Sequence, residues 1–342
     1  MSLKNLSAKN KIPKLLKNKL NNNRIKQIYE KFEKSIDLKE NFAVAVSGGP
    51  DSLALAFLAK IFSVQKKKLV KFLIVDHKLR PESSLEAKLV KKVLKKNSIN
   101  AEILTWKKKQ SIKNIQSAAR NKRYELLFAK CDKFKINNIL LGHHEDDLVE
   151  NFFIRLLRGS GLKGLVSLDK KVKIGSKILY RPLLNQKKKD LIFLSKYIFD
   201  FYIEDPSNID QKYLRVVIRK LIEELQKKGL DKKKFIKTIN NLKLSDEVIN
   251  FYTNYNLKKN SYFSRKNGRI ILSNVFFQQP KEIVFRSFSE AIRIIGERYY
   301  SARGKKLDKV LNDLERDAPF KITLSGCIIE KVNQMVIISK EN

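Results

Sequence analysis

The sequence contains few cysteines and few histidines. Among its 342 residues there are two cysteines, Cys131 and Cys327, and three histidines. Two cysteines so far apart exclude a CxxC metal, iron–sulfur or redox motif. This low cysteine usage is typical of proteins in a reducing compartment, and we expect a cytoplasmic protein.

Long apolar segments are also missing. No stretch approaches the roughly 20 apolar residues needed to span a bilayer, so we expect no membrane association. The N-terminus, MSLKNLSAKNKIPKLLKNKLNNN, is basic and has no uninterrupted apolar run. It therefore fits neither a secretory signal nor an anchor, and we interpret residues 1–23 as a flexible basic arm.

Acidic residues are scarce. There are 35 Asp and Glu against 73 Lys and Arg, which gives a formal net charge of +38. Such a field attracts polyanions, nucleic acid first among them. A coding bias toward Lys, Asn and Ile explains part of the lysine excess but not the shortage of acids. The hydrophobic content of 43% indicates a globular protein, and the length allows two domains with a substantial core.

The first half of the chain alternates short β-rich runs with helical patterns. Near-continuously apolar strands separated by helices predict parallel βαβ units, an α/β fold with helices on both faces of the sheet. The helices are expected near 51–63, 83–97, 114–133 and 144–158. The strands are expected at 42–47, 70–76, 100–106, 137–143 and 177–184.

The second half has a different pattern. Residues 187–229 look helical apart from a loop at 204–213, and residues 231–259 and 278–314 look helical too. A hairpin is expected at 261–274 and two strands joined by a polar turn at 319–340. We predict a catalytic domain over 24–215 and a smaller, basic α+β accessory domain over 220–342.

The stretch SGGPDS, residues 47–52, lies where a strand gives way to a helix. Free backbone N–H groups and the helix dipole favour an anion at such a point, and the glycines let the main chain approach a ligand closely. The lysine of a Walker A loop is absent. A carboxylate beside a phosphate needs a cation between them, so Asp51 implies Mg²⁺ at an anionic ligand. Alternatively, Pro50 and Asp51 only start the helix.

A second polar cluster, GHHEDDLVE, spans residues 142–150, at the end of the strand expected at 137–143. Two histidines and several acids there have the chemistry to ligate metal, orient a nucleophile or accept a proton. All three histidines of the chain, His77, His143 and His144, lie at strand ends. The carboxyl ends of parallel strands share one edge, so residues 47–52, 76–80 and 142–147 are expected to form a pocket. Helix capping by solvated residues is the alternative.

Arginines form a third group in a chain dominated by lysine. The planar guanidinium can bond two phosphate oxygens at once, so arginines near the pocket favour a phosphate-bearing substrate. Each one alone is as consistent with an ordinary surface residue. The group comprises Arg120, Arg123, Arg155, Arg158, Arg181, Arg215 and Arg219.

The ordered motifs resemble a known family. SGGPDS resembles the SGGxDS signature of the PP-loop, or N-type, ATP pyrophosphatases, which cleave ATP to AMP and pyrophosphate. Together with SAARNKRYELL, GHHEDDLVENFFIRLLRGSGLKGL, YRPLL and IEDPSNIDQKYLR, it resembles the tRNA(Ile)-lysidine synthetase family. The similarity covers most of residues 41–220 and extends more weakly to TLSGCIIEKVNQMVII near the C-terminus, which resembles that family's substrate-binding domain. The resemblance therefore implies that the accessory domain over 220–342 binds the tRNA.

The resemblance implies a Rossmann-like PP-loop ATPase and a C–N ligase. Such an enzyme adenylates the wobble cytidine of the CAU anticodon of tRNA(Ile) and then attaches free L-lysine, consuming ATP with Mg²⁺. It implies Asp51 and Asp147 as metal ligands, and Asp76 and His77 beside the adenosine. The implied pyrophosphate cradle is Ser47, Gly48, Gly49, Pro50, Asp51 and Ser52. The implied catalytic residues are Asp51, Arg120, His143, Asp147, Glu150 and Arg215.

The chain departs from the family pattern at three positions. Leu148 and Asn151 replace the Gln and Thr of HHxDDQxET, and Val216 replaces the asparagine of RNxxR. The additional C-terminal domain of longer members is not expected. The main alternative function is that of a tRNA thiolase of the same superfamily, which needs catalytic cysteines or a cluster. A small-molecule PP-loop synthetase does not need the basic charge, and an RNA-binding module does not explain SGGPDS with HHEDD.

Overall fold

The computed structural model describes residues 14–106, 115–204, 212–264, 268–297, 302, 304–316 and 320–341. The chain forms two compact units, Met1–Ile236 and Lys237–Asn342. The division falls later than the boundary expected near residues 215–220. Helix α10 (Leu214–Lys227) packs on α7 (Glu145–Leu156), where Ile218 and Ile222 are buried with Val149, and this contact holds it in the first unit.

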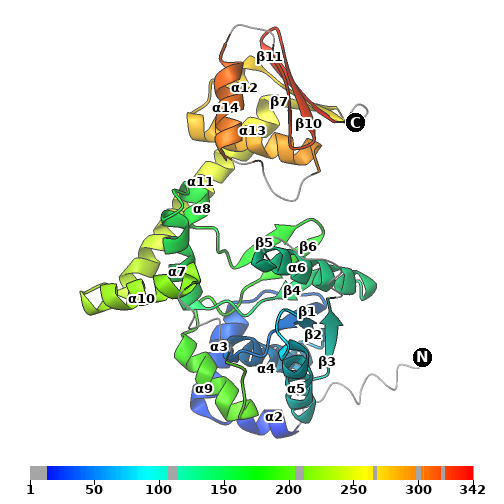
Figure 1. Ribbon diagram of the computed structural model, residues 1–342, viewed down its shortest axis with the longest axis vertical. Helices are drawn as coiled ribbons and strands as arrows, with labels where there is room; N and C mark the ends of the chain where they lie inside the picture. The colour runs from blue at the N-terminus through cyan, green and yellow to red at the C-terminus, as the bar shows by residue number, and fades with distance from the viewer. Residues whose placement is uncertain are drawn as a thin grey trace. The chain divides into compact units, whose positions relative to one another are not determined.

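The first unit is built on one six-stranded sheet, in the order β3-β2-β1-β4-β6-β5 (Figure 1). Every neighbouring pair is parallel except β5 and β6, which form an antiparallel hairpin that the sequence reading missed. The α/β fold with a mostly parallel sheet is confirmed. The strands are β1 (Phe42–Val46), β2 (Val70–Asp76), β3 (Ala101–Thr105), β4 (Asn138–Leu140), β5 (Lys171–Ile174) and β6 (Lys177–Tyr180).

Helices surround this sheet, and one of them is central. The helices of this unit, with α7 and α10, are α2 (Lys14–Lys19), α3 (Asn23–Lys34), α4 (Pro50–Gln65), α5 (Ser83–Lys96), α6 (Ile115–Lys133), α8 (Leu162–Leu165) and α9 (Lys188–Phe199). Helix α4 contacts β1 and β2 on one side and α3 and α9 on the other. It is therefore buried on nearly all sides, which explains its uniformly apolar sequence.

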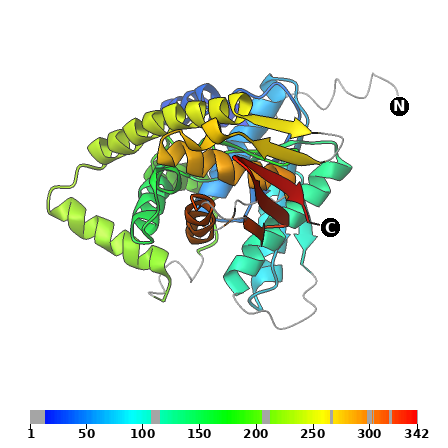
Figure 2. The same cartoon turned by 90° about the horizontal axis from the view of Figure 1, so that it is seen from above.

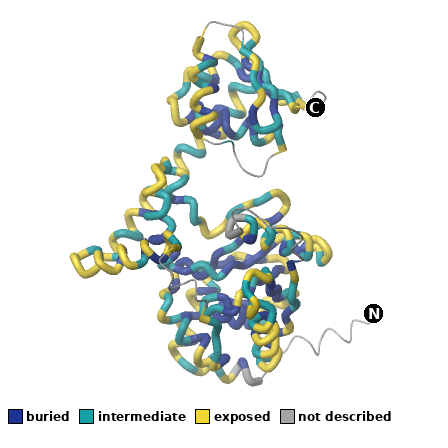
Figure 3. Tube along the Cα trace, in the orientation of Figure 1, coloured by how far each residue is buried: buried dark blue, intermediate teal, exposed yellow. Residues whose placement is uncertain are grey.

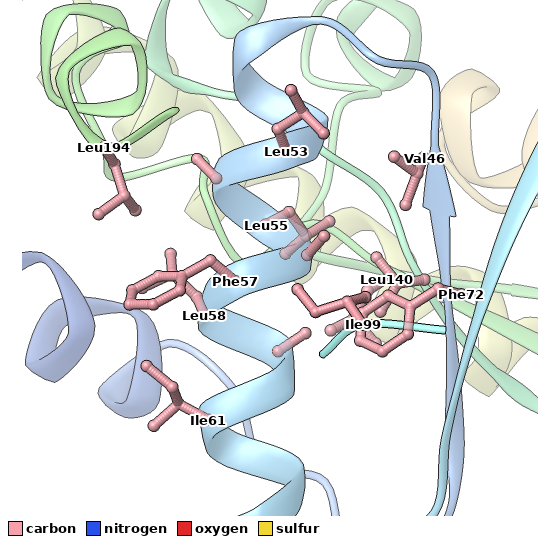
Figure 4. Packing of buried hydrophobic residues seen from close by; sticks show 14 of the residues in the cluster. Val46, Leu53, Leu55, Phe57, Leu58, Ile61, Phe72, Ile99, Leu140 and Leu194 are labelled. Atoms are coloured by element: carbon pink, nitrogen blue, oxygen red, sulfur yellow. The ribbon is translucent and has the colours of Figure 1, made fainter. Parts of the chain in front are cut away.

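Side chains of β1 alternate between two cores, one on each face of the sheet. Phe42, Val44 and Val46 join the larger core, whereas Ala43 joins a smaller one with Leu127 of α6. Since successive strand residues point to opposite faces, an apolar strand such as FAVAV requires helices on both sides. Figure 4 shows the larger core, with α4 packed along β1 and β2.

Part of the segment expected as a flexible arm is folded. Residues Lys14–Lys19 form α2, and Leu16 is fully buried in the larger core. Asn22 caps α3, whose Ile25 and Phe32 are also buried there. The apolar residues of this basic segment therefore anchor it, while residues 1–13 lie outside the described part of the chain.

The second unit contains an antiparallel sheet in the order β7-β8-β11-β10-β9. Its elements are α11 (Lys232–Lys259), β7 (Ser261–Ser264), β8 (Arg269–Leu272), α12 (Asn274–Phe277), α13 (Lys281–Ile295), α14 (Gly304–Leu314), β9 (Phe320–Leu324), β10 (Cys327–Val332) and β11 (Met335–Lys340). Helix α11 begins in the first unit and ends in this one. Helix α13 contacts β8 and β11, and its apolar face meets the sheet in a separate core (Figures 1, 2 and 3).

The C-terminal segment has three strands where two were expected. Leu324 pairs with Cys327, so Ser325 and Gly326 form a two-residue hairpin turn, with φ of +55° and +79°. Positive φ at both central residues matches the twist of a tight hairpin. Only one turn was expected in residues 319–340, and Ser325–Gly326 was not identified as a second, because Ser–Gly is a weaker turn signal than Asn–Gly.

Among the described residues, no helix is both long enough and apolar enough to cross a membrane.

Candidate active site at the carboxyl ends of β1 and β4

The sheet order places two polar segments side by side. The chain runs from β1 outward through β2 to β3 and then returns to β4 on the other side of β1. In open α/β sheets, ligands bind at the carboxyl edge where the strand order reverses in this way. Residues 47–52 follow β1 and residues 141–147 follow β4, so both lie at this switch point.

The segment SGGPDS is held in shape by its own last residue. Ser52 Oγ accepts the backbone N–H groups of Ser47 and Gly48, each at 3.1 Å, and donates to Gly49 O at 2.9 Å. Gly48 has φ of +91°, and a Cβ there would lie 2.6 Å from Val90 Cγ2. Glycine is therefore required at this position by both conformation and space.

The N-terminus of α4 opens toward the same point. Gly49 is its N-cap residue and supplies no side-chain cap, and Pro50 occupies the first turn. The helix start is tied to α9 by Ser195, whose hydroxyl donates to Pro50 O at 2.6 Å. An uncapped N-terminus of a 16-residue helix beside a glycine loop favours an anion.

Asp51 carries a buried oxygen that has no hydrogen-bond partner. Its Oδ1 is unpartnered, while Oδ2 lies 3.6 Å from His144 Nε2. Burial raises the pKa of this carboxyl above its usual value, His144 opposes that rise, and nearby Asp147 adds to it. Because a buried carboxylate oxygen without a partner is costly, this atom is suited to bind a cation or a ligand donor.

Helix α7 begins with a reciprocal cap formed by His144 and Asp147. His144 Nδ1 accepts the Asp146 N–H at 3.2 Å, and Asp147 Oδ2 accepts the His144 N–H at 2.9 Å. His144 and Asp147 are buried at 3% and 7% exposure. Both side chains cap α7, but they are buried, and His144 also lies against Asp51. They are therefore not solvated capping residues.

Two arginines of α10 pair with the acids of α7. Arg215 donates from Nη2 to Asp147 Oδ1 at 2.8 Å and from Nε to Glu150 Oε2 at 2.6 Å. Arg219 donates from Nε to Glu150 Oε1 at 2.6 Å. The pKa of Asp147 is lowered: burial acts against this, but His144 and Arg215 outweigh it. The network brings together three of the expected site residues, Asp147, Glu150 and Arg215.

His143 has a different hydrogen-bond partner, Arg181. Its Nδ1 accepts from Arg181 Nε at 3.2 Å, and Arg181 also donates to Asp169 O at 2.7 Å. Burial lowers the pKa of His143 to about 3, with the charges of Arg181, Arg215 and Arg120 acting in the same direction. The ring is therefore neutral at pH 7. The charge of Arg120, on α6, thus acts on His143, although Arg120 itself is exposed.

Asp76 and His77 lie at the end of β2, next to β1. Asp76 is buried and accepts from Lys78 N at 3.0 Å and from Ser84 Oγ at 2.7 Å. His77 Nδ1 is buried without a partner. Burial lowers the pKa of His77 to about 4, and the charge of Arg123 adds to this effect. The segment after β2, like the segment after β1, therefore carries a buried polar atom without a hydrogen-bond partner.

The two carboxylates expected to bind a metal, Asp51 and Asp147, differ in their contacts. Within the described residues no cluster of three His, Cys, Asp or Glu side chains is arranged to hold a metal. Asp147 already uses both oxygens, whereas Asp51 Oδ1 is available. Mg²⁺ is usually bound by one or two carboxylates together with substrate phosphates, so the residues present fit that mode.

Three residues of the network, His144, Arg181 and Arg219, were not among the expected site residues. Residue type and spacing do not indicate which of two adjacent histidines faces Asp51, and the contacts of Arg181 with His143 and of Arg219 with Glu150 depend on how distant segments pack. The departures from the family pattern are accommodated by packing: Leu148 and Val216 are buried at 7% and 6% exposure, and Asn151 donates to Ser167 Oγ at 3.3 Å.

Comparison with known proteins matches residues 17–225 to a family described as the PP-loop domain. A tRNA(Ile)-lysidine synthase from Wolbachia pipientis wMel is 34% identical over 88% of this chain and 70% of the relative. One from Orientia tsutsugamushi (strain Boryong) is 35% identical over 87% of this chain and 69% of the relative. The chain belongs to the tRNA(Ile)-lysidine synthase family.

The fold of this family member also resembles a solved structure with a different activity. A U34-tRNA thiolase from Methanococcus maripaludis aligns with a TM-score of 0.54 at 19% identity, covering 64% of this chain and 78% of the thiolase. That structure contains an iron–sulfur cluster. Here Cys131 and Cys327 are buried thiols in different units and form no disulfide, and burial raises the pKa of the Cys131 thiol to about 11. The likeness therefore extends to the fold alone.

Proposed function

We propose that this chain ligates free L-lysine to the wobble cytidine of the CAU anticodon of a tRNA(Ile). In the first step the cytosine ring oxygen attacks the α-phosphorus of ATP and pyrophosphate leaves. In the second step the ε-amine of lysine forms a C–N bond at that ring carbon, and the oxygen departs with AMP. The two cysteines are buried thiols that form no disulfide, which fits a cytoplasmic location, where tRNA is modified.

One observation supports this most strongly. The unpartnered Asp51 Oδ1 lies at the start of α4, and His144 connects it to the acid and arginine network of α7 and α10. A binder of nucleic acid alone has no use for a buried, unpaired carboxylate oxygen at a helix N-terminus. A nucleotide-cleaving site does, because both anion and cation are held there.

We assign the pyrophosphate of ATP to Ser47, Gly48, Gly49, Pro50, Asp51 and Ser52. Backbone N–H groups and the α4 N-terminus attract the phosphates, and Gly49, where a Cβ would meet only Ser47 Oγ at 3.9 Å, leaves the main chain open to them. Asp51 would hold Mg²⁺ through its unpartnered Oδ1, and Asp147 would join it by exchanging its present bond from Arg215 for the metal, which supplies charge neutralisation at the phosphates. Asp76 and His77, at the neighbouring strand end, are assigned to the adenosine.

We assign the incoming lysine to His143, Asp147 and Glu150. An ammonium group is attracted by the two carboxylates, and one of them can take the proton that the amine must lose before attack. His143 is less suited as that base, because its Nδ1 is occupied by Arg181 and its pKa is about 3. A neutral His143 instead offers a donor at Nε2.

We assign Arg120 and Arg215 to the phosphates and to the negative charge that develops during transfer. Fixed guanidinium groups stabilise such charge strongly where water is excluded. Arg215 is at present paired with Asp147 and Glu150, which positions it at the edge of the site.

The positive charge is concentrated in the catalytic unit. Residues 1–236 contain 54 Lys and Arg against 24 Asp and Glu, whereas residues 237–342 contain 19 against 11. The first unit therefore has a net charge of +30 and the second +8. We infer that most of the attraction for the tRNA backbone comes from the catalytic unit, and that the accessory domain contributes less charge than its sequence region suggested.

The decisive experiment mixes the purified protein with ATP, Mg²⁺, labelled lysine and a minor tRNA(Ile) with a CAU anticodon. Label in the tRNA, dependent on ATP, is the expected result. A parallel reaction with a labelled sulfur donor tests the thiolase alternative. Sulfur incorporation without lysine incorporation would replace the proposal with that activity.

A further inference from the structure

The ring of His144 lies between two carboxylates from different helices. Its Nε2 is 3.6 Å from Asp51 Oδ2, at the start of α4, and 3.7 Å from Asp147 Oδ2, in α7. The side chain is buried, with 4% exposure. The ring therefore joins the loop after β1 to the loop after β4 inside the site.

The tautomer of His144 follows from its other nitrogen. Nδ1 accepts the backbone N–H of Asp146 at 3.2 Å, and an accepting ring nitrogen carries no proton. In the neutral ring the proton is consequently on Nε2. The N–H bond dipole then points toward the two carboxylates.

This placement settles how Asp51 is oriented. Two buried carboxylates repel each other strongly in a medium of low dielectric constant, and a positive N–H edge between them reduces that repulsion. Asp51 Oδ2 faces the ring, so Oδ1 is the oxygen left buried and unpartnered. Without the ring, Asp51 has no comparable reason to keep this orientation.

We propose that His144 is a positioning residue whose Nε2–H fixes Asp51 against α7 and leaves Asp51 Oδ1 available for the ligand. The proposal rests on the proposed ATP site but not on the identity of the tRNA or the amine. It assigns a role to the second histidine of the pair, distinct from that of His143. The ring also caps α7, so the test must separate the two roles.

Two substitutions separate the capping role from the positioning role, because each retains the hydrogen-bonding group of only one ring nitrogen. His144→Asn keeps an acceptor near the Nδ1 position and is a good N-cap, but it cannot reach the carboxylates. His144→Gln places an N–H donor near the Nε2 position and is a poor N-cap. Asn22→Ala is the matched control, because Asn22 caps α3 through Arg24 N and Ile25 N away from the site.

The measurement is binding of a non-hydrolysable ATP analogue by calorimetry, with and without Mg²⁺, and without tRNA or lysine. We expect His144→Asn to keep the wild-type Tm and to weaken Mg²⁺-dependent binding about 10- to 100-fold, as for other residues that orient a ligand-holding group. His144→Gln is expected to lower Tm, as Asn22→Ala does, while its binding stays within about threefold of wild type.

Any other combination of Tm and analogue binding in the two His144 variants overturns the proposal. If His144→Asn binds like wild type and His144→Gln loses binding, His144 is only a cap. If both lose binding together with Tm, its role is general stability. Failure of lysine transfer by a wild-type protein that binds the analogue would instead count against the proposed function, so the two failures are distinguishable.

Discussion

Gly142 packs against the backbone of Asp51. A Cβ at Gly142 would lie 3.2 Å from the Asp51 carbonyl carbon, 3.3 Å from its oxygen and 3.2 Å from Ser52 N. The loop after β4 therefore approaches the loop after β1 with no room for a side chain. This contact sets the distance between the phosphate cradle and the acids of α7.

We predict that Gly142→Ala weakens ATP binding by moving the start of α4. The added methyl meets backbone, which cannot rotate away, and overpacking of this kind costs about 1–3 kcal/mol of unfolding free energy. KM for ATP in pyrophosphate exchange is expected to rise by about tenfold or more. Gly161→Ala is the matched control, because a Cβ there meets nothing within 4 Å. Equal effects of the two substitutions would show that the packing of Gly142 is unimportant.

A second prediction concerns Asp51. Asp51→Asn keeps the shape of the side chain and removes its charge, so ATP–pyrophosphate exchange should fall about 100-fold or more while tRNA binding persists. Asp190→Asn is the control, since Asp190 pairs with Arg24 through Nη2 at 2.7 Å, away from the site. Filter binding of tRNA and isotope exchange measure the two properties separately. Exchange at the wild-type rate in Asp51→Asn would contradict the assigned role.

Much of this site was predictable because it depends on strand order and residue type. A strand followed by SGGPDS and a strand followed by GHHEDD must meet at one edge once the sheet is parallel. What the sequence does not contain is the direction of each side chain. Whether His143 or His144 faces Asp51 depends on the cap geometry at the start of α7, and Arg219 joins Glu150 only because α10 packs on α7.

Two segments of the fold were not predictable from the sequence either. Strands β1 to β4 are marked by apolar runs, but β5, KVKI, alternates between exposed and partly buried residues, so its sequence does not predict a strand. At the N-terminus, lysine and asparagine dominate the composition. The sequence therefore does not indicate that Leu16 is a core residue, although it is fully buried. In both segments the structure is decided by contacts with distant residues and not by local composition.

A third prediction uses two adjacent valines of α10. Val216 is buried at 6% exposure, whereas Val217 is exposed at 45%. Val216→Asn restores the residue type of the family motif but buries an amide in apolar surroundings, which should cost about 1–3 kcal/mol of unfolding free energy. Val217→Asn should change it by less than about 0.5 kcal/mol. Urea titration of both variants measures this. Unchanged stability in Val216→Asn would mean that the introduced amide finds a polar partner on α7 or α10.

A fourth prediction is a dependence of stability on pH through His77. Its pKa is about 4 in the folded protein and near 6.5 when unfolded, so the unfolded state binds the proton more readily. The contribution is present above pH 6.5 and is lost as pH falls from 6.5 toward 4. His77→Gln should therefore show a smaller loss of unfolding free energy over that range than wild type. Parallel slopes for the two proteins in urea titrations across that range would refute it.

The last prediction concerns the tRNA. Because the first unit carries most of the positive charge, tRNA affinity should fall about 100-fold or more between about 50 and 200 mM salt, since the release of counterions on binding is less favourable at higher salt. Replacing Arg155 and Arg158, in and just after α7, with glutamine should reduce the slope of log affinity against log salt by about one to two. Arg316→Gln in the second unit is the control and should reduce it less. A slope that is flat in wild type, or that responds mainly to Arg316, would place the attraction outside the catalytic unit.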